Sequence, residues 1–269
     1  MKPKTKAIAV VSGKGGVGKS NFSLNFSISL SKRGLNVLLF DMDIGMGNLD
    51  ILMGRSSERT IVDYLTGTSR ITDIIMEGPE GVKFIGGGTG LGQLVNQDRL
   101  GTLSDDLDTF LEEYDYLIFD MGAGISQESL KFLLSVHEII VITTPEPTAL
   151  MDAYAIIKYL HLADAKLPFQ LVANRTNSVQ EGSATLNRLT KVVKRFLDME
   201  PVWLGVLPDD RSVQQAVNRQ IPFMTFNPKS KASLALEELV SRYIEGVGQI
   251  PANQSVSFVS RLKKFLFER

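Results

Sequence analysis

Short, almost continuous runs of apolar residues recur along the chain and alternate with longer segments of mixed polarity. Runs this apolar are typical of strands that are covered on both faces, as in a parallel sheet. The predicted strands are KAIAVVS (6–12), NVLLFDMD (36–43), VKFIGG (82–87), YDYLIFDMG (114–122), HEIIVITT (137–144), FQLVANR (169–175) and VWLGVLP (202–208). Predicted helices are 19–33, about 97–113, 126–135, 148–161, 182–198 and 230–245. The alternation predicts an α/β fold: a doubly wound, mostly parallel sheet with helices on both faces.

The C-terminal end departs from this alternation. GVGQIPANQ (246–254) is rich in Gly, Pro and Asn and poor in apolar residues, which is typical of a linker. We therefore predict a domain over 1–246, a linker over 247–255 and a separate helix over 256–269. On a helical wheel this last segment gathers apolar residues on one broad arc and basic residues beside it, the pattern of an amphipathic helix at a membrane surface. The predicted membrane residues are Phe258, Val259, Leu262, Lys263, Lys264, Phe265 and Leu266. The alternative is a helix packed on the body of the protein.

Composition narrows the possible functions. The 269 residues carry a formal net charge of −1, so no global basic field attracts nucleic acid. The chain has no cysteine, which excludes disulfides and Cys-ligated zinc or iron–sulfur clusters. His137 and His161 have no metal-ligand spacing. No apolar stretch approaches the 18 residues of a membrane span, and the N-terminal run is too short for a signal peptide, so we predict a cytoplasmic protein.

VVSGKGGVGKSN (10–21) fits two phosphate-binding templates. Gly13, Gly15 and Gly18 make G-x-G-x-x-G, which binds dinucleotides, while Gly13, Gly18, Lys19 and Ser20 make G-x-x-x-x-G-K-S, which binds nucleoside triphosphates. Both templates require a strand before the loop and a helix after it. A dinucleotide site also needs an acidic residue about 20 positions further on to bind the ribose, and Asp41, at the end of the next strand, is in that position.

Lys19 and Ser20 favour the triphosphate. A dinucleotide loop has no use for a cation there, whereas a triphosphate requires a lysine on its outer phosphates and a hydroxyl on Mg²⁺. YLIFD (116–120) supplies a matching part, because triphosphatases place a carboxylate such as Asp120 at the end of an apolar strand. Neither template explains Lys14. A side chain at that position projects outward, where a cation suits the phosphates of a second subunit.

The GKGGVGKS loop is the deviant Walker A signature, and the chain resembles the MinD/ParA family of ATPases over nearly its whole length. DMDIGMGNLDILMG (41–54), FDMGAGIS (119–126) and LPDDRSV (207–213) resemble the first switch, the second switch and the base-binding loop of MinD. Within the family, the segment from Gly18 to Gly34 and the DMDIGMGNLDILMG segment are most similar to FlhG (YlxH, FleN), regulators of flagellar number and placement.

The resemblance implies a role for each motif residue in an ATP-dependent homodimer with two ATP molecules between its subunits. Lys14 would reach the partner's phosphates, Lys19 would hold the β- and γ-phosphates, and Asp43 would orient the attacking water. Mg²⁺ would be held by Ser20, Asp41 and Asp120. ATP or ADP would contact Gly13, Lys14, Gly15, Gly16, Val17, Gly18, Lys19, Ser20 and Asn21, and adenine would contact Asn174, Pro208 and Asp210.

The resemblance also implies partners. ATP-driven dimerisation would place two tails on an anionic membrane, so we predict a peripheral location on the inner face of the cell membrane. An FlhG-like protein would also bind an FlhF-like GTPase and flagellar switch-complex proteins. The alternatives are MinD-type division-site placement, ParA-type DNA partitioning and FleN-like binding of a transcription factor. Specific nucleic-acid binding is not expected, and a dehydrogenase remains the alternative only if NAD binds and ATP does not.

Overall fold

Residues 5–43, 48–87, 110–125, 127–164, 166–246 and 257–267 are described by the structure, which is a computed structural model. Their strands form one eight-stranded sheet in the order β3-β4-β2-β5-β1-β6-β7-β8. All neighbouring strands are parallel except β3 and β4. The bounds are β1 Lys6–Val11, β2 Val37–Met42, β3 Ile75–Glu77, β4 Lys83–Ile85, β5 Tyr116–Met121, β6 Glu138–Thr143, β7 Phe169–Thr176 and β8 Val202–Pro208. The predicted doubly wound sheet is confirmed, and every predicted strand is present.

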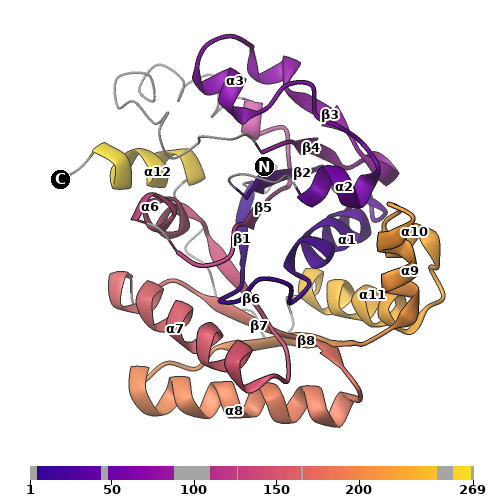
Figure 1. Ribbon diagram of the computed structural model, residues 1–269. Helices are drawn as coiled ribbons and strands as arrows, with labels where there is room; N and C mark the ends of the chain where they lie inside the picture. The colour runs from indigo at the N-terminus through magenta and orange to yellow at the C-terminus, as the bar shows by residue number, and fades with distance from the viewer. Residues whose placement is uncertain are drawn as a thin grey trace.

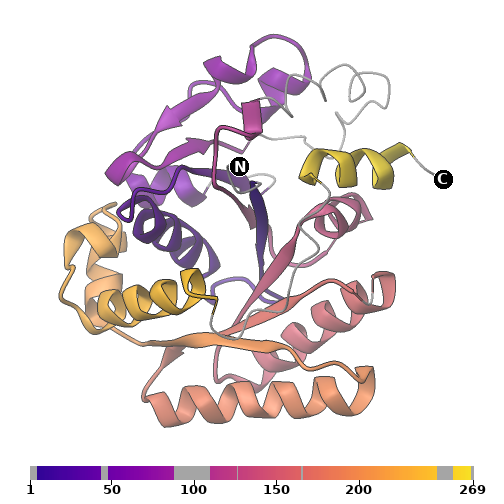
Figure 2. The same cartoon turned by 180° about the vertical axis from the view of Figure 1, so that it is seen from behind.

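Helices cover both faces of this sheet (Figures 1 and 2). The larger ones are α1 Lys19–Ser31, α6 Gln127–Ser135, α7 Pro147–Ala163, α8 Val179–Leu197, α11 Lys231–Ile244 and α12 Phe258–Phe267. Shorter helices, which the sequence pattern did not predict, are α2 Asn48–Met53, α3 Ile61–Leu65, α9 Arg211–Asn218 and α10 Phe223–Phe226. The 3₁₀ turns Ile71–Asp73 and Pro79–Gly81 and the antiparallel strand β3 were also not predicted. The helix predicted at about 97–113 lies mainly outside the described residues.

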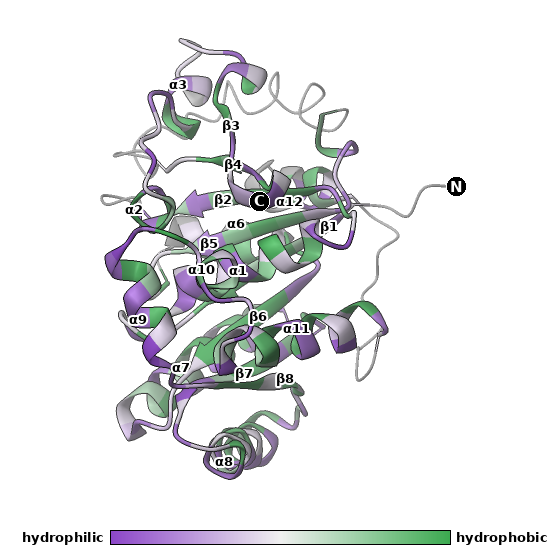
Figure 3. Ribbon diagram, turned by 90° about the vertical axis from the view of Figure 1, so that its right-hand side faces the viewer, coloured by the Kyte–Doolittle hydropathy of each residue, from purple (hydrophilic) through white to green (hydrophobic). Residues whose placement is uncertain are grey.

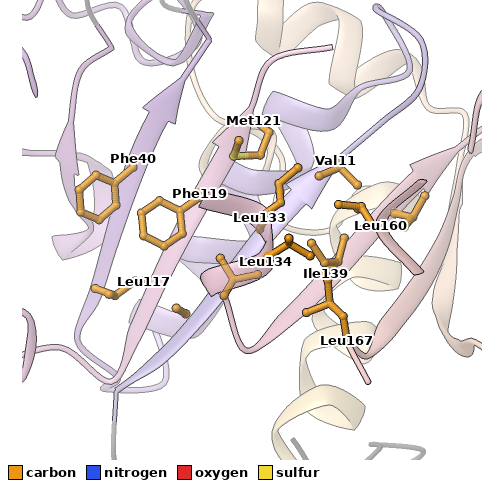
Figure 4. Packing of buried hydrophobic residues seen from close by; sticks show 14 of the residues in the cluster. Val11, Phe40, Leu117, Phe119, Met121, Leu133, Leu134, Ile139, Leu160 and Leu167 are labelled. Carbon is orange, nitrogen blue, oxygen red and sulfur yellow. The ribbon is translucent and has the colours of Figure 1, made fainter. Parts of the chain in front are cut away.

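Successive residues of each central strand enter opposite cores, because side chains alternate across a strand. In β1, Ala7, Ala9 and Val11 join the core beneath α6, α7 and α8, whereas Ile8 and Val10 join the core beneath α1 and α11. Figure 4 shows part of the first core, in which Leu133 and Leu134 of α6 lie over strand residues including Leu117 and Ile139. The strands form the green interior of Figure 3, and purple is concentrated on outer helices and loops. Burial on both faces explains the uninterrupted apolar runs in the sequence.

Helix α1 is buried on almost every side, although eight of its thirteen residues are polar. Its polar groups bond within the helix and to its neighbours: the Ser27 hydroxyl donates to Ser23 O at 2.7 Å, and the Asn25 amide donates to Asn21 O at 2.8 Å. Asn25 Oδ1 also accepts the Met224 N–H at 3.0 Å, which ties α1 to α10. A buried polar group costs stability unless it is hydrogen-bonded, so these bonds let α1 lie inside the molecule and fix the loop that precedes it.

The last helix packs against α6 on one side of the molecule (Figure 1). Phe258 is 7% exposed and Val259 is 4% exposed, and the Phe258 ring lies 5.1 Å from the Phe119 ring and 5.5 Å from the Phe132 ring. Leu262 packs against the same core. We call this contact surface, formed by Phe119, Phe132 and their neighbours, the tail seat. The structure therefore contains the packed helix that the sequence left as an alternative, with the apolar residues at its start turned inward.

No helix among the described residues is both long enough and apolar enough to cross a bilayer. The predicted linker 247–255 and the ends of the predicted helix, 256 and 268–269, lie outside the described residues. The side chains of Lys263, Phe265 and Leu266 also lie outside them, whereas Lys264 is exposed.

Candidate nucleotide-binding site

The glycine-rich loop joins the carboxyl end of β1 to the first turn of α1, as both templates require. Gly16 and Gly18 have φ angles of 79° and 92°, which side-chain-bearing residues rarely adopt. A Cβ atom on Gly18 would lie 2.4 Å from Asn174 Nδ2, and one on Gly13 would lie 2.3 Å from the backbone of Asp152. Close packing and left-handed backbone therefore both require glycine here. The backbone N–H groups of such a loop and of the helix start suit an anionic ligand.

Lys19 lies on the inner side of this loop, next to the carboxylate that ends β5. Its Nζ donates to Asp120 Oδ1 at 3.0 Å, and the Ser23 hydroxyl donates to the same oxygen at 2.8 Å. The Lys19 side chain is 8% exposed and that of Asp120 is fully buried. The structure thus brings together two residues that the sequence placed 101 positions apart. Ser20 is half-buried in the first turn of α1, directly after Lys19.

Asp41 and Asp120 occupy paired positions on the adjacent strands β2 and β5. Asp41 is 1% exposed, and its two oxygens accept the N–H groups of Asp43 and Leu49 at 3.0 and 3.2 Å. Burial, with a contribution from the carboxylates of Asp120 and Asp43, raises the pKa of Asp41 to about 6. Two buried carboxylates at neighbouring positions repel each other, so the site favours a cation.

A magnesium ion fits this pair of acids. Asp120 Oδ2 is buried and has no hydrogen-bond partner in the described part of the chain. Within the same part, no cluster of three His, Asp or Glu side chains could hold a metal by itself. Mg²⁺ usually takes one or two carboxylates and completes its shell with phosphate oxygens and water. Asp41, Asp120 and the Ser20 hydroxyl are the residues that would hold it.

Asp43 lies at the same end of the sheet, half-buried. Its Oδ2 accepts the Asn48 amide at 2.9 Å, and its Oδ1 would lie 3.3 Å from a Cβ atom on Gly122, in the loop after β5. Asp43 therefore connects the two segments that resemble switches. Its predicted role with the attacking water stays a prediction.

Lys14 lies on the outer side of the loop, and its side chain is 44% exposed. Its Nζ lies 2.7 Å from Glu146 Oε2 and 3.3 Å from Thr148 Oγ1, at the start of α7. The Lys14 ammonium, hydrogen-bonded to Glu146, holds the pKa of that carboxyl below its ordinary value. The sequence predicted that Lys14 projects outward; in the structure its side chain is partly exposed, turns toward the start of α7 and lines the cavity beside the loop. Glu146, its partner within the chain, was not predicted.

A cavity of about 310 Å³ lies beside the loop. Its lining includes Lys14, Gly15, Gly16 and Val17, all predicted, together with Thr144, Pro145, Glu146, Arg175, Asn177 and Asp209. The Thr144 hydroxyl is buried and has no hydrogen-bond partner within the described residues. Arg175 has a φ of 56°, rare for a residue with a side chain, and donates to Gly16 O at 3.2 Å. The TTPE segment at the end of a strand was the signal that could have found Thr144 and Glu146.

The three predicted adenine contacts have different surroundings. The Asn174 amide donates to Val17 O at 2.8 Å, so it supports the loop directly. Pro208 ends β8, beside the cavity-lining Asp209. Asp210 caps two helices, because one of its oxygens accepts the Ser212 N–H at 2.8 Å and the other accepts the Ala232 N–H at 3.1 Å. The structure gives Asn174 and Asp210 structural roles, and an adenine contact by any of the three stays a prediction.

This loop, lysine, hydroxyl and strand-end carboxylate on a doubly wound sheet define a P-loop nucleotide-binding protein. Residues 8–223 match the CobQ/CobB/MinD/ParA nucleotide binding domain family. The chain belongs to this family, and the predicted resemblance to MinD/ParA proteins is confirmed.

Named relatives refine the comparison. The antiactivator FleN of Pseudomonas aeruginosa is 36% identical over 239 residues, covering 88% of this chain and 85% of that protein. The flagellum site-determining protein YlxH of Helicobacter pylori is 35% identical, covering 98% of this chain and 92% of that protein. The septum site-determining protein MinD of Pyrococcus horikoshii, solved with Mg-ADP, has a TM-score of 0.73 at 26% identity and covers 91% of this chain and 99% of that one. The predicted similarity to the FlhG group is confirmed.

Proposed function

We propose that the protein is a Mg²⁺-dependent ATPase switch that forms a homodimer with ATP and binds the membrane reversibly through its C-terminal helix. The main observation in support is the position of the two lysines of one loop. Lys19 is buried beside Asp120, within reach of a nucleotide held by its own loop, whereas Lys14 is exposed on the outer side. One cation serves the bound nucleotide, and the other is available to a nucleotide on a second subunit.

Hydrolysis uses the chain's own residues in distinct roles. ATP phosphates in the loop attract Lys19 away from Asp120, which frees that carboxylate. Asp43 orients the attacking water and accepts its proton as the bond to the γ-phosphate breaks. Lys14 of the partner stabilises the negative charge that develops on the phosphate oxygens. Mg²⁺, when bound by Ser20, Asp41 and Asp120 with phosphate oxygens, supplies further charge neutralisation.

Sedimentation velocity with ATP and Mg²⁺ tests the dimer. We expect wild type to dimerise and Lys14→Ala to stay monomeric while still binding ATP. Asp43→Ala should bind ATP, hydrolyse it slowly and accumulate as the dimer. Equal dimerisation of wild type and Lys14→Ala would contradict the role across subunits.

Membrane binding requires α12 to leave the tail seat, because Phe258 and Val259 are buried there. Burial of each large apolar side chain contributes about 1.5–3 kcal/mol, either in the seat or in a bilayer. The two sites therefore compete for the same residues on nearly equal terms. Two tails on one dimer tip the balance by avidity.

A matched pair of variants in α12 tests this step. Phe258→Asp removes an apolar contact, whereas Ser260→Asp adds the same charge at an exposed position of the same helix. We expect Phe258→Asp to lose ATP-dependent binding to anionic vesicles much more than Ser260→Asp, with dimerisation intact in both. Equal binding by the two variants would exclude Phe258 as a membrane anchor.

The flagellar relatives support a role in flagellar number or placement, with an FlhF-like GTPase and switch-complex proteins as partners. The antiactivator among them supports a second candidate, in which the dimer binds a transcription factor. A pull-down with the Asp43→Ala dimer distinguishes these partners. Flagellar counts in a strain that lacks the protein test the biological role, and an unchanged count would contradict it.

A further inference from the structure

Large apolar side chains that remain exposed are concentrated on two neighbouring helices. Of eleven such residues in the described part of the chain, six lie on α7 and α8: Met151, Tyr159, Leu162, Val179, Val192 and Phe196. The most exposed are Leu162 at 71%, Met151 at 65% and Phe196 at 64%. The two helices touch where the Tyr154 ring lies 6.4 Å from the Phe196 ring. Exposed large apolar side chains that lie together mark binding surfaces, and three of the six, Tyr159, Leu162 and Phe196, lie toward the same ends of the two helices.

The C-terminal ends of these helices lie away from the nucleotide loop. In a parallel sheet each crossover helix starts at the carboxyl ends of the strands and finishes at their amino ends. The nucleotide loop is at the carboxyl end of β1, so the last turns of α7 and α8 lie at the opposite edge. Tyr159 and Leu162 are in the last part of α7, and Phe196 is in the last turn of α8. We define the distal edge as Tyr159, Leu162, Lys191, Arg195 and Phe196.

Positive charge accompanies the apolar residues of the distal edge. Lys191 and Arg195 lie one turn apart on the exposed side of α8, and the Arg195 guanidinium lies 5.4 Å from the Phe196 ring centre. No acidic residue occurs in α8 after Glu181. Nearby, Lys194 pairs with Glu200 at 2.9 Å, Asp198 follows the helix, and Lys166 is exposed in the loop after α7. The chain as a whole has a net charge of −1, so this edge is locally basic.

The tail seat and the distal edge lie on the same side of the molecule. Arg261 of α12 donates to Val136 O at 2.8 Å, at the point where β6 is about to begin. Burial lowers the pKa of the Arg261 guanidinium. The carboxylate of Asp164, just after α7, raises that same pKa, so α12 lies close to the end of α7. Figures 1 and 2 show α12 and the ends of α7 and α8 on the same side of the molecule. A tail that leaves its seat therefore starts on the same side of the molecule as the distal edge.

We infer that the distal edge is a second contact with an anionic bilayer, made when α12 inserts. This inference rests on the proposed membrane binding and adds a site to it. Phe196 and Leu162 enter the interface while Lys191 and Arg195 meet lipid phosphates, as expected for mixed basic and aromatic surfaces. The residues are spread over the ends of two helices, on the same side of the molecule as α12. A broad, flat surface suits this arrangement better than a narrow peptide does.

Matched charge reversals in the full-length protein test the site. Lys191→Glu with Arg195→Glu changes the distal edge, and Lys229→Glu with Lys231→Glu makes the same change in net charge at exposed positions beside α10 and α11, on the other face of the sheet. Both double variants are first checked for ATP-dependent dimerisation. Binding is then measured by co-sedimentation with phosphatidylcholine vesicles that contain phosphatidylglycerol.

We expect the distal-edge variant to bind about thirtyfold more weakly than wild type, since each lost cation near anionic lipid contributes about 1 kcal/mol. The control should bind within about threefold of wild type. Phe196→Ser should weaken binding in the same direction as the distal-edge reversal. Equal binding by the two double variants would overturn the inference while leaving the tail mechanism intact. Absence of binding by wild type with ATP would overturn both.

A protein ligand is a separate outcome of the same comparison. If the distal-edge variant binds vesicles like wild type but loses a soluble acidic partner in a pull-down, the surface binds protein and the bilayer assignment is wrong.

Discussion

The two lysines of the phosphate loop each pair with a carboxylate of the same chain, but in opposite surroundings. Lys19 and Asp120 are 8% and 0% exposed, whereas Lys14 and Glu146 are 44% and 61% exposed. A buried pair is strongly coupled, because each charge left alone pays a large desolvation cost. An exposed pair contributes little and exchanges partners readily. The inner lysine thus belongs to the fold and the site together, and the outer one is free to change partners.

The largest expected effect is on the free energy of unfolding, which should depend on the buried Lys19–Asp120 pair and not on the exposed Lys14–Glu146 pair. Asp120→Asn leaves Lys19 buried without a counter-charge and should lower the free energy of unfolding by about 3 kcal/mol in the nucleotide-free protein. Glu146→Gln, at the exposed pair, should leave it unchanged within error. Urea unfolding measures both. Similar losses in the two variants would mean that the pairs do not differ as their burial implies.

The acids beside the inner pair give a pH test of about the same size. The pKa of Asp41 is about 6 in the fold against an ordinary value of 3.8, so the folded state binds this proton more tightly than the unfolded chain. The resulting stability is fully present below pH about 4 and is lost as the pH rises through 6, up to about 3 kcal/mol. Thermal unfolding without nucleotide should show this loss, and Asp41→Asn should remove that part of the pH dependence. An unchanged profile in Asp41→Asn would assign the effect to other groups.

The affinity for ATP should also differ between variants of the two lysines. Lys19→Ala should weaken ATP binding about hundredfold, equivalent to about 2.7 kcal/mol, because a charged hydrogen bond to the phosphates is lost. Lys14→Ala should change the ATP affinity of the monomer by less than about threefold. Calorimetry at a protein concentration below dimerisation distinguishes the two. Equal losses would place both lysines on the same nucleotide.

The smallest expected effect concerns Glu146. Glu146→Gln weakens the hold on Lys14 and should lower the ATP concentration needed for half-maximal dimerisation by about twofold, as expected for an exposed pair. Sedimentation across an ATP titration measures the shift. A higher requirement for ATP in this variant would instead show that Glu146 supports the dimer.

Much of the fold followed from the sequence because the sheet is buried on both faces. Apolar runs such as YLIFD (116–120) identify strands without help from tertiary contacts, and all seven predicted strands are present. Strand β3, with only three residues, and the helices α2 and α10 are too short for a periodic signal. Their conformations depend on packing, as the bond from Met224 to Asn25 illustrates.

The site was predictable where a motif fixes both residue type and spacing. Gly13, Lys19, Ser20 and the strand-end acids were predicted because the templates for phosphate and magnesium binding require those groups. Arg175 could not, because its place in the cavity depends on which loops meet beside Gly16. Thr144 and Glu146 were missed, although the TTPE segment at the end of a predicted strand was a signal for them. Asn174 was predicted as a base contact, but a side-chain bond to Val17 O can be seen only once the strands are assembled.

Phe119 offers a way to change the release of the C-terminal helix separately from the chemistry at the nucleotide site. Its ring stacks on Phe40 at 4.6 Å and touches Phe258 at 5.1 Å, while the next residue in the chain is Asp120. A smaller apolar residue at position 119 would loosen the hold on the tail without altering any charge around the nucleotide. Graded replacements at this one position would therefore yield a series of proteins that differ in how readily the tail departs. Such a series would let experimenters adjust time spent on lipid independently of catalysis.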